Sequence, residues 1–387
     1  MVALRHELPG HDLLSARRRI GAVFALQAFA LSMMHMRIPD LQLRAGLQES
    51  ELGLVLVAAP IGASLVFVMA SPLIEYFGTR LLFLVSLPLL SLSAALLTVS
   101  TSMPVMFAML FVSGVMSAAG SVAMSIETDR IEAGTGARIM NRCHGMWSVG
   151  YFLSSLLAGA IRSAGVDPAV HLWAVVPLVL VAVLAVAGPM AQFPPRAFAG
   201  PARRSGFASP TPAVLVIVAF GLGVCLLENT SLVWATILVR DTFDVAPMVE
   251  SSALPALIMA MALGRLFSDR FIDIHGPRRV GGVTAALALA GLSIVVLAPN
   301  AWLVLFGFAV AGLGSGVAFP LMMSVAARLG DRPASQNVAA VTLLVQIALL
   351  GMPIAVGAIA EAWGVRAAFA CLIPLIALGL LMSRKLR

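Results

Sequence analysis

The sequence predicts an all-α membrane protein with twelve transmembrane helices arranged as two six-helix halves. Three observations support this prediction: the composition, the spacing of long apolar runs, and a loop motif that occurs twice. Of the 387 residues, 60% are hydrophobic and only 11% are charged, and the mean hydropathy is +1.00. Soluble domains contain about 25% charged residues, so this composition places the chain in lipid.

Twelve apolar runs are separated by short joints that contain charged residues, glycine or proline. Each run approaches the length of about 20 residues that crosses a hydrocarbon core of about 30 Å. An open strand in lipid would leave backbone groups unpaired, and the runs are too long for barrel strands, so we predict helices. The predicted spans are residues 20–36, 52–74, 80–100, 104–126, 139–161, 170–190, 212–238, 249–267, 279–298, 301–325, 335–358 and 366–383.

The distribution of basic residues predicts that both termini lie in the cytoplasm. Cytoplasmic loops of membrane proteins carry an excess of lysine and arginine. With both termini inside, only five of the 25 lysines and arginines fall outside, namely Arg37, Arg44, Arg162, Arg240 and Arg366. The net charge of +7 then belongs to a face that meets anionic membrane lipid, and no nucleic-acid partner is expected.

The loop after the second span and the loop after the eighth share an acidic residue, a glycine and an arginine at the same spacing. The two sets lie 198 residues apart: Glu75, Gly78 and Arg80 match Asp273, Gly276 and Arg278. At the same offset, Gly114 matches Gly312, Ser117 matches Ser315 and Gly159 matches Gly357. These matches predict a duplicated six-helix unit.

The duplication divides the chain into three parts. Residues 1–191 form the predicted N-terminal half, and residues 212–387 form the C-terminal half. Residues 192–211 are rich in proline, glycine and arginine, and such a composition cannot bury a core. We interpret them as a cytoplasmic linker.

Glu228 is the one acidic residue predicted to lie deep within a span. A charge at the bilayer centre costs about 2.5–3.5 kcal/mol on insertion scales, so an acid there suggests a function. Desolvation favours the uncharged carboxyl, which would let the residue bind and release a proton. The alternative is a structural acid held by a neighbouring helix or by Asn229.

Other polar residues within the spans are weaker candidates for a solute site. Ser113, Ser117, Ser121 and Ser125 form one stripe on span 4, which suits either a polar cavity or close helix packing. Gln27 is predicted to lie near the midplane of span 1, whereas Arg37 is expected to snorkel to the interface. Gln346 on span 11 could line a cavity or bond to another helix.

The start of span 5 gathers several polar and aromatic residues, which are Asn141, His144, Trp147 and Ser148. An imidazole can titrate near neutrality, and an indole can stack on the apolar face of a sugar. The alternative is a histidine and a tryptophan at the membrane interface.

Enzymatic and metal chemistry are not predicted. Cys143, Cys225 and Cys371 are odd in number and lack paired spacing, so neither a disulfide nor a metal site is indicated. A membrane-embedded transferase would need clustered acids or a nucleophilic set, and the sequence contains neither. No cofactor is expected.

The duplicated loop motif resembles the signature loop of the major facilitator superfamily, and the resemblance covers the whole chain. The region 132–150, with Arg142, His144 and Trp147, resembles a bacterial inner-membrane branch distantly similar to the fucose permease. The second half agrees through Glu228, Trp234, Arg240, Asp241, Gly264, Arg265, Leu266 and Asp269. The resemblance implies the major facilitator fold and transport by alternating access.

The resemblance also implies roles for individual residues. In the signature loops, Glu75 with Arg80, and Asp269 or Asp273 with Arg278, would form contacts that bias the inward and outward states, with Gly78 and Gly276 permitting the turns. The branch usually carries an aspartate and an asparagine on span 4 where Ser121 and Ser125 stand. This departure puts a sugar substrate in doubt, and it makes Ser121 the favoured cavity residue of the stripe.

The sequence therefore predicts a secondary active transporter for a small polar organic solute, with sugar-like solutes included. We expect a monomer in a bacterial inner membrane that performs proton-coupled uptake. Proton-driven efflux of a drug or metabolite is the alternative, which the missing Gly-Pro pattern of span 5 disfavours. A non-transporting membrane sensor or scaffold is an alternative of another class.

Overall fold

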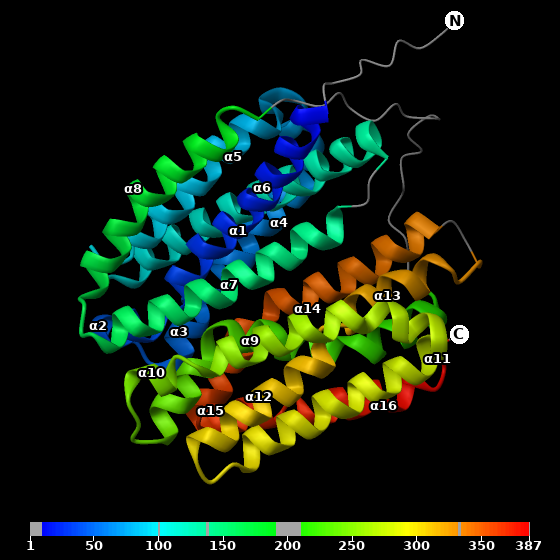
Figure 1. The fold of residues 1–387 in the computed structure, drawn as a ribbon. Coiled ribbons are helices and arrows are strands. Elements are labelled where there is room, and N and C mark those ends of the chain that lie inside the picture. Colours follow the sequence, from blue (N-terminus) through cyan, green and yellow to red (C-terminus); the bar gives the residue numbers. More distant parts are fainter. Residues whose placement is uncertain (1–9, 100, 137–138, 191–209, 332–333, 387) are drawn as a thin grey trace, which may run out of the picture.

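Two bundles of long helices lie next to each other, and the start of α1 and the end of α16 lie on the same side of the molecule (Figure 1). The computed structural model describes residues 10–99, 101–136, 139–190, 210–331 and 334–386. We call the side where α1 begins and α16 ends the terminal face. The opposite side, where α2 and α10 lie, is called the distal face.

The described residues before the linker form α1 to α8. Their bounds are α1 Gly10–His35, α2 Ile38–Ala45, α3 Glu49–Leu56, α4 Ala58–Val68, α5 Ala70–Leu96, α6 Met103–Thr135, α7 Met140–Ser163 and α8 Pro168–Ala187. Within this set α1 packs on α7 and α8, and α6 packs on α4 and α5.

The described residues after the linker form α9 to α16. Their bounds are α9 Pro212–Thr242, α10 Pro247–Glu250, α11 Ala253–Leu297, α12 Ala301–Ser315, α13 Ala318–Ala327, α14 Ala334–Trp363, α15 Val365–Ala370 and α16 Ile373–Ser383. Here α12 packs on α11, and α9 packs on α14 and α16.

Local sequence explains where many helices begin. Ser102, Asp167, Thr211 and Asn300 each accept a backbone N–H with the side chain, which caps α6, α8, α9 and α12. In three of these helices proline stands at the first or second position, where its missing N–H costs nothing.

The membrane fold class is confirmed. Eleven helical stretches of the described chain are long and apolar enough to cross a membrane, and they match every predicted span except the fifth. The fifth is α7, which spans 24 residues but carries more polar side chains than the others. It completes the set of twelve.

Several predicted boundaries were wrong. The predicted loop after span 1 contains a helix, α2, which Pro39 and Gly46 delimit. The predicted break at Gly78 is present as a sharp turn between two helical arms of α5, but it is shorter than predicted because both arms extend to that glycine. Predicted spans 2 and 10 are each broken, at Val57 and at Gly316–Val317 respectively.

The two signature loops have the same backbone conformation at their glycines. Gly78 has φ 70° and ψ 159°, and Gly276 has φ 78° and ψ 160°. Only glycine adopts this region without strain, and it turns the chain sharply between two helical arms. The same rare conformation thus occurs at two positions 198 residues apart.

Helix contacts repeat at the same offset. A Cβ atom added to Gly114 would clash with the carbonyl oxygen of Ala59, and one added to Gly312 would clash with the carbonyl oxygen of Leu257. Both members of each contact are 198 residues from their counterparts. The two halves therefore pack their helices in the same way, as duplicated units do.

Contacts between the two halves are also related by this offset. Gly159 on α7 packs against Ser251, whereas Gly357 on α14 packs against Gly53. The predicted linker, residues 192–211, lies almost entirely outside the described residues. The domain boundaries therefore stay a prediction.

Candidate solute and proton site

Glu228 forms an ion pair with Arg265 near the middle of α9. The distance between Glu228 Oε1 and Arg265 Nη2 is 3.4 Å. The two side chains are 27% and 34% exposed, so the pair is neither sealed in the protein nor freely solvated. Each charge offsets part of the cost of removing the other from water. This arrangement supports the structural alternative as well as a proton site.

Arg265 is held in place by a second bond. Its Nε donates to the carbonyl oxygen of Gly316 at 3.1 Å, where α12 ends. A Cβ atom on Gly316 would come within 3.1 Å of the Arg265 side chain, so a larger residue would crowd it. The guanidinium is therefore fixed by α12 and turned toward Glu228. Sequence analysis used Arg265 only as part of the family resemblance and did not identify it as a site residue, although a basic residue inside a predicted span was a signal.

The pair has no counterpart in the first half. The residues 198 positions before Glu228 and Arg265 are Ala30 and Phe67. Packing glycines and loop glycines are duplicated, whereas this charge pair is not. The two halves are alike in scaffold and different in chemistry.

Gln27 and Ser121 are brought together across α1 and α6. The Gln27 amide donates to the Ser117 carbonyl at 2.8 Å and to Ser121 Oγ at 3.1 Å. Gln27 is 1% exposed, so its amide ties two helices together in this conformation. The predicted serine stripe is split, because Ser113 is buried against Met34 whereas Ser125 is exposed.

The face of α7 predicted to carry His144 and Trp147 forms an aromatic cluster with α1. Trp147 stacks on Tyr151 with ring centroids 5.1 Å apart, and the Tyr151 hydroxyl pairs with His35 Nδ1 at 2.8 Å. His144 meets Phe24 edge-on at 5.2 Å and is otherwise exposed. Asn141 belongs to α7, but its side chain lies outside the described set.

His144 also links this cluster to the charge pair. Its imidazole lies near enough to Arg265 for the two to interact electrostatically, across contacting helices α7 and α11. The two remaining candidates are not joined to Glu228 by a described contact. Asn229 donates to the Cys225 carbonyl of its own helix at 2.9 Å, and Gln346 lies half-buried on α14.

The signature-loop charges are exposed at the terminal face. Glu75, Arg80, Asp273 and Arg278 are exposed and form no ion pair with another described residue. The side chain of Asp269 lies outside the described set. Among the described side chains, the predicted contacts of Glu75, Arg80, Asp273 and Arg278 to facing helices are not seen.

The distal face carries an ion-pair cluster that sequence analysis missed. Arg162 donates to Asp40 at 2.8 Å, to Glu250 at 2.6 Å and to Ser251 at 3.3 Å, joining the first half to the second. On the other side of the interface, the backbone N–H of Ser50 donates to Glu361 at 3.1 Å. We call these contacts the distal clasp.

Arg37 does not snorkel to the interface as expected. It is 2% exposed and donates to three acceptors, namely His171 Nδ1 at 2.9 Å, Asp40 at 2.9 Å and the Val166 carbonyl at 2.8 Å. Enough partners are present to satisfy the guanidinium inside the protein. Asp40 therefore bridges Arg37 and Arg162 and supports the clasp.

The sequence profile of the Major Facilitator Superfamily matches residues 20–271 and 219–387, which together cover nearly the whole chain. The chain belongs to the Major Facilitator Superfamily. Members of this superfamily are secondary transporters of small solutes, so the chain is a transporter and not an enzyme.

Relatives and solved structures agree with this assignment. The chain is 26% identical to an uncharacterised MFS-type transporter of Yersinia pestis, over 88% of this chain and 87% of that protein. It is 25% identical to the membrane protein MosC of Rhizobium meliloti, over 98% and 90% of the two chains. The fold resembles the nucleoside transporter NupG with a TM-score of 0.75 at 10% identity, over 96% and 98% of the chains.

A second solved structure has the same fold. A bacterial homologue of the human lysosomal transporter Spinster, crystallised in an inward-facing and occupied conformation, matches with a TM-score of 0.76 at 12% identity. The match covers 97% of both chains. At sequence identities this low, the similarity to both solved structures shows a shared fold and nothing about the solute.

Proposed function

We propose that this Major Facilitator Superfamily member takes up a small polar organic solute by proton-coupled alternating access, with Glu228 as the proton site. The observation that carries the proposal is the half-exposed Glu228–Arg265 pair near the middle of α9, present in only one half. We also place the chain in the bacterial inner-membrane branch that is distantly similar to the fucose permease, with both termini in the cytoplasm.

The pair provides a way to couple a proton to a solute. Arg265 keeps its bond to Gly316 when Glu228 is protonated, but its Nη2 loses a charged acceptor. A solute oxygen can then accept from the released guanidinium donors. Loss of the proton restores the ion pair and expels the solute oxygen. His144 and Trp147 on the facing helix α7 would contact the other side of the solute.

The distal clasp supports a role for this conformation as one stage of the proposed cycle. With Arg162 and Glu361 joining the halves, the distal face is closed, which in our topology is the outward side. The exposed signature-loop charges are free to form their contacts when the terminal face closes. Glu75, Arg80, Asp269, Asp273 and Arg278 would then bias the states, as the family resemblance implies.

A ligand-stabilisation screen would identify the solute first. A ligand at about 100 times its Kd stabilises the folded state by about 2.7 kcal/mol, which a thermal unfolding assay detects. Sugars, carboxylates, amino acids and nucleosides form a suitable panel for the purified chain.

Proteoliposomes with an imposed pH gradient then test the coupling. We expect wild-type protein to accumulate the solute, and the Glu228→Gln variant to catalyse solute exchange without accumulation, because the amide mimics the protonated acid. Asp244→Asn is a matched control, since Asp244 is exposed in the loop after α9 and has no described partner. Gradient-driven accumulation by Glu228→Gln would refute the proton site. Accumulation in the reverse direction would support efflux, and absence of flux for every bound solute would support a sensor.

A further inference from the structure

One large cavity lies away from the proposed transport site. Its volume is about 1000 Å³, and it lies in the second half, between the two arms of α11 and beside α12 and α16. A second cavity of about 500 Å³ lies in the first half and is almost entirely apolar. Glu228 lines neither cavity.

The body of the larger cavity is apolar and faces away from the charge pair. Leu263, Phe267, Phe271 and His275 line it from the first arm of α11, four residues apart and therefore on one face of the helix. Arg265 is two residues from Leu263 and from Phe267, which places it on the opposite face. Phe267 and Phe271 are both 54% exposed. In helices that cross a membrane, such a surface meets acyl chains.

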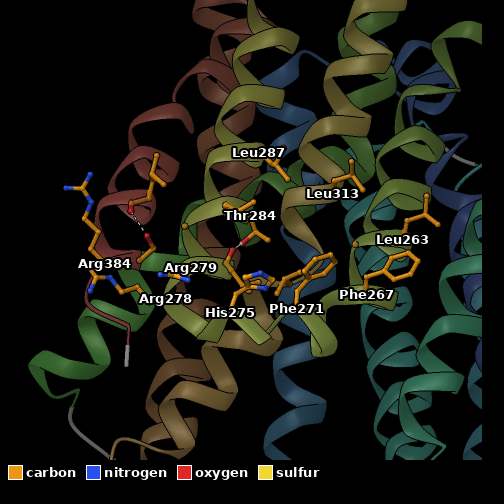
Figure 2. A pocket seen from close by; sticks show the side chains of 17 residues that line it. Leu263, Phe267, Phe271, His275, Arg278, Arg279, Thr284, Leu287, Leu313 and Arg384 are labelled. Carbon is orange, nitrogen blue, oxygen red and sulfur yellow. Dashed lines mark hydrogen bonds between the residues drawn. The ribbon is translucent and has the colours of Figure 1, made fainter. Parts of the chain in front are cut away.

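One end of the cavity is basic. Arg278, Arg279 and Arg384 line it, all three are exposed, and none forms an ion pair with another described residue. Figure 2 shows the three arginines at one side of the cavity, while Leu263 and Phe267 lie at the other side. Two helices, α11 and the end of α16, thus bring three guanidinium groups to one edge of an apolar groove.

Two neutral hydroxyl groups that line the cavity near this edge are already bonded within their own helices. Thr284 Oγ1 donates to the Val280 carbonyl at 3.0 Å, and Ser383 Oγ donates to the Leu380 carbonyl at 2.7 Å. Asp273 lies on the same helix but does not line the cavity. The three arginines and the His275 imidazole are therefore the polar side chains left to bind a ligand, and the three positive charges favour an anion.

We propose that this groove binds an anionic phospholipid, with the phosphate held by Arg278, Arg279 and Arg384 and an acyl chain against Leu263, Phe267 and Phe271. Guanidinium groups bind phosphate through paired charge-assisted hydrogen bonds. A free phosphate would leave the apolar body empty, and a zwitterionic phospholipid would bring a cationic group that the three arginines repel. The groove shares Arg278 with the proposed signature-loop contacts but not Glu228 or Arg265, so its test does not depend on the transported solute.

Native mass spectrometry of the delipidated full chain tests the site. Phosphatidylglycerol and phosphatidylcholine with identical acyl chains are the two probes. We expect the wild type to retain one phosphatidylglycerol under conditions that remove phosphatidylcholine. Equal retention of the two lipids would overturn the proposal, and this comparison needs no variant.

Variants then locate the site. Each basic residue near a membrane surface contributes about fivefold in affinity for anionic lipid, so we expect Arg279→Gln or Arg384→Gln to weaken phosphatidylglycerol binding about fivefold and the double variant about twenty-five-fold. Lys385→Gln is the matched control, because Lys385 is exposed next to Arg384 but does not line the cavity. An equal loss in the control would show a general charge effect and contradict the site.

The apolar portion has its own test. Val283→Trp, at a lining position that is 60% exposed, should fill the groove and weaken phosphatidylglycerol binding while leaving all three arginines in place. Thermal unfolding would verify that this variant folds. Competition by glycerol 1-phosphate provides the last arm, and displacement of the lipid at equal concentration would show a phosphate site that does not recognise the acyl chain.

Discussion

At the scale of single residues, Arg265 decides what Glu228 can do. An isolated carboxylate in mid-membrane is costly, but one beside a fixed guanidinium has a charged partner in the resting state. The bond from Arg265 Nε to Gly316 fixes that partner, so the pair can open at the Glu228 end alone. The chemistry of the proposed site thus depends on two residues that lie on different helices.

This geometry predicts that Arg265→Lys is not a conservative change. An ammonium group cannot span both the Gly316 carbonyl and Glu228 as the guanidinium fork does. We expect solute exchange in liposomes to fall about tenfold, the equivalent of losing about 1.4 kcal/mol of binding. An unchanged exchange rate would mean that the guanidinium geometry is not used.

A double-mutant cycle tests whether the two residues act together. Removing either charge alone breaks the ion pair and leaves one charge behind. The double variant Glu228→Gln with Arg265→Gln should therefore lose less stability than the sum of the losses in the two single variants. Coupled neighbours typically show interaction free energies of about 0.5–3 kcal/mol. The measurement is the loss of stability of each variant in thermal unfolding without solute, and additive losses would contradict the coupling.

At the scale of helices, glycine determines how closely neighbouring elements approach. Gly114 and Gly312 place one helix against a backbone carbonyl of the next, at Ala59 and Leu257. Such contacts between small residues are the main way in which membrane helices pack tightly. The signature-loop glycines act differently, since Gly78 and Gly276 supply a backbone conformation instead of space.

Alanine substitutions should show that Gly114 and Gly312 are needed because neighbouring backbone leaves no room for a side chain. We expect Gly114→Ala and Gly312→Ala to lower the free energy of unfolding by about 1–3 kcal/mol, because a methyl group would overlap backbone that cannot move freely. Gly351→Ala is the matched control, since a Cβ atom there meets nothing within 4 Å. Thermal unfolding in detergent would measure the difference, and an equal loss at Gly351 would contradict the packing explanation.

At the scale of the whole molecule, the clasp and the duplicated contacts describe how two halves can move against each other. Gly159 with Ser251, and Gly357 with Gly53, join the halves at positions related by the repeat. The clasp adds charge at the same face, with Arg162 only 9% exposed. Breaking these contacts is a precondition for opening the distal face.

Disulfide cross-linking can trap this state. Cysteines at positions 159 and 251, in a chain whose three native cysteines are replaced, should cross-link readily, because a Cβ atom at 159 would lie 3.0 Å from the Ser251 Cβ atom. We expect the cross-link to stop solute exchange and a reductant to restore it. Undiminished exchange by the cross-linked protein would show that the distal face does not need to open.

The same cross-link measures the strength of the clasp. Arg162→Gln leaves Asp40 and Glu250 without their shared partner, and breaking a buried pair costs about 3–5 kcal/mol. We expect the initial rate of cross-linking to fall at least about tenfold as the distal-closed state loses population. Arg366→Gln is the control, since Arg366 bonds the Ala298 carbonyl within its own half, and it should leave the rate unchanged.

Much of the fold was predictable because it follows from local properties of the sequence. Hydropathy and run length depend on consecutive residues, and the 198-residue repeat depends on identity at fixed spacing. These properties determined the twelve spans, the duplication, the two glycine turns and the depth of Glu228. Even α7, with its polar face, was predicted by its length and position.

Only the tertiary structure decided which distant side chains meet. Arg265 is 37 residues from Glu228 in sequence, Arg162 is 88 from Glu250, and Arg37 is 134 from His171. Hydropathy cannot show that Gln27 turns to α6, or that Arg37 is buried among enough acceptors to need no interface. The sequence by itself determined a duplicated twelve-helix scaffold with one deep acid. The packing of helices far apart in the chain decided that Arg265 is the partner of this acid. An ion pair depends on where helices lie in space and not on the residues beside each charge in the sequence.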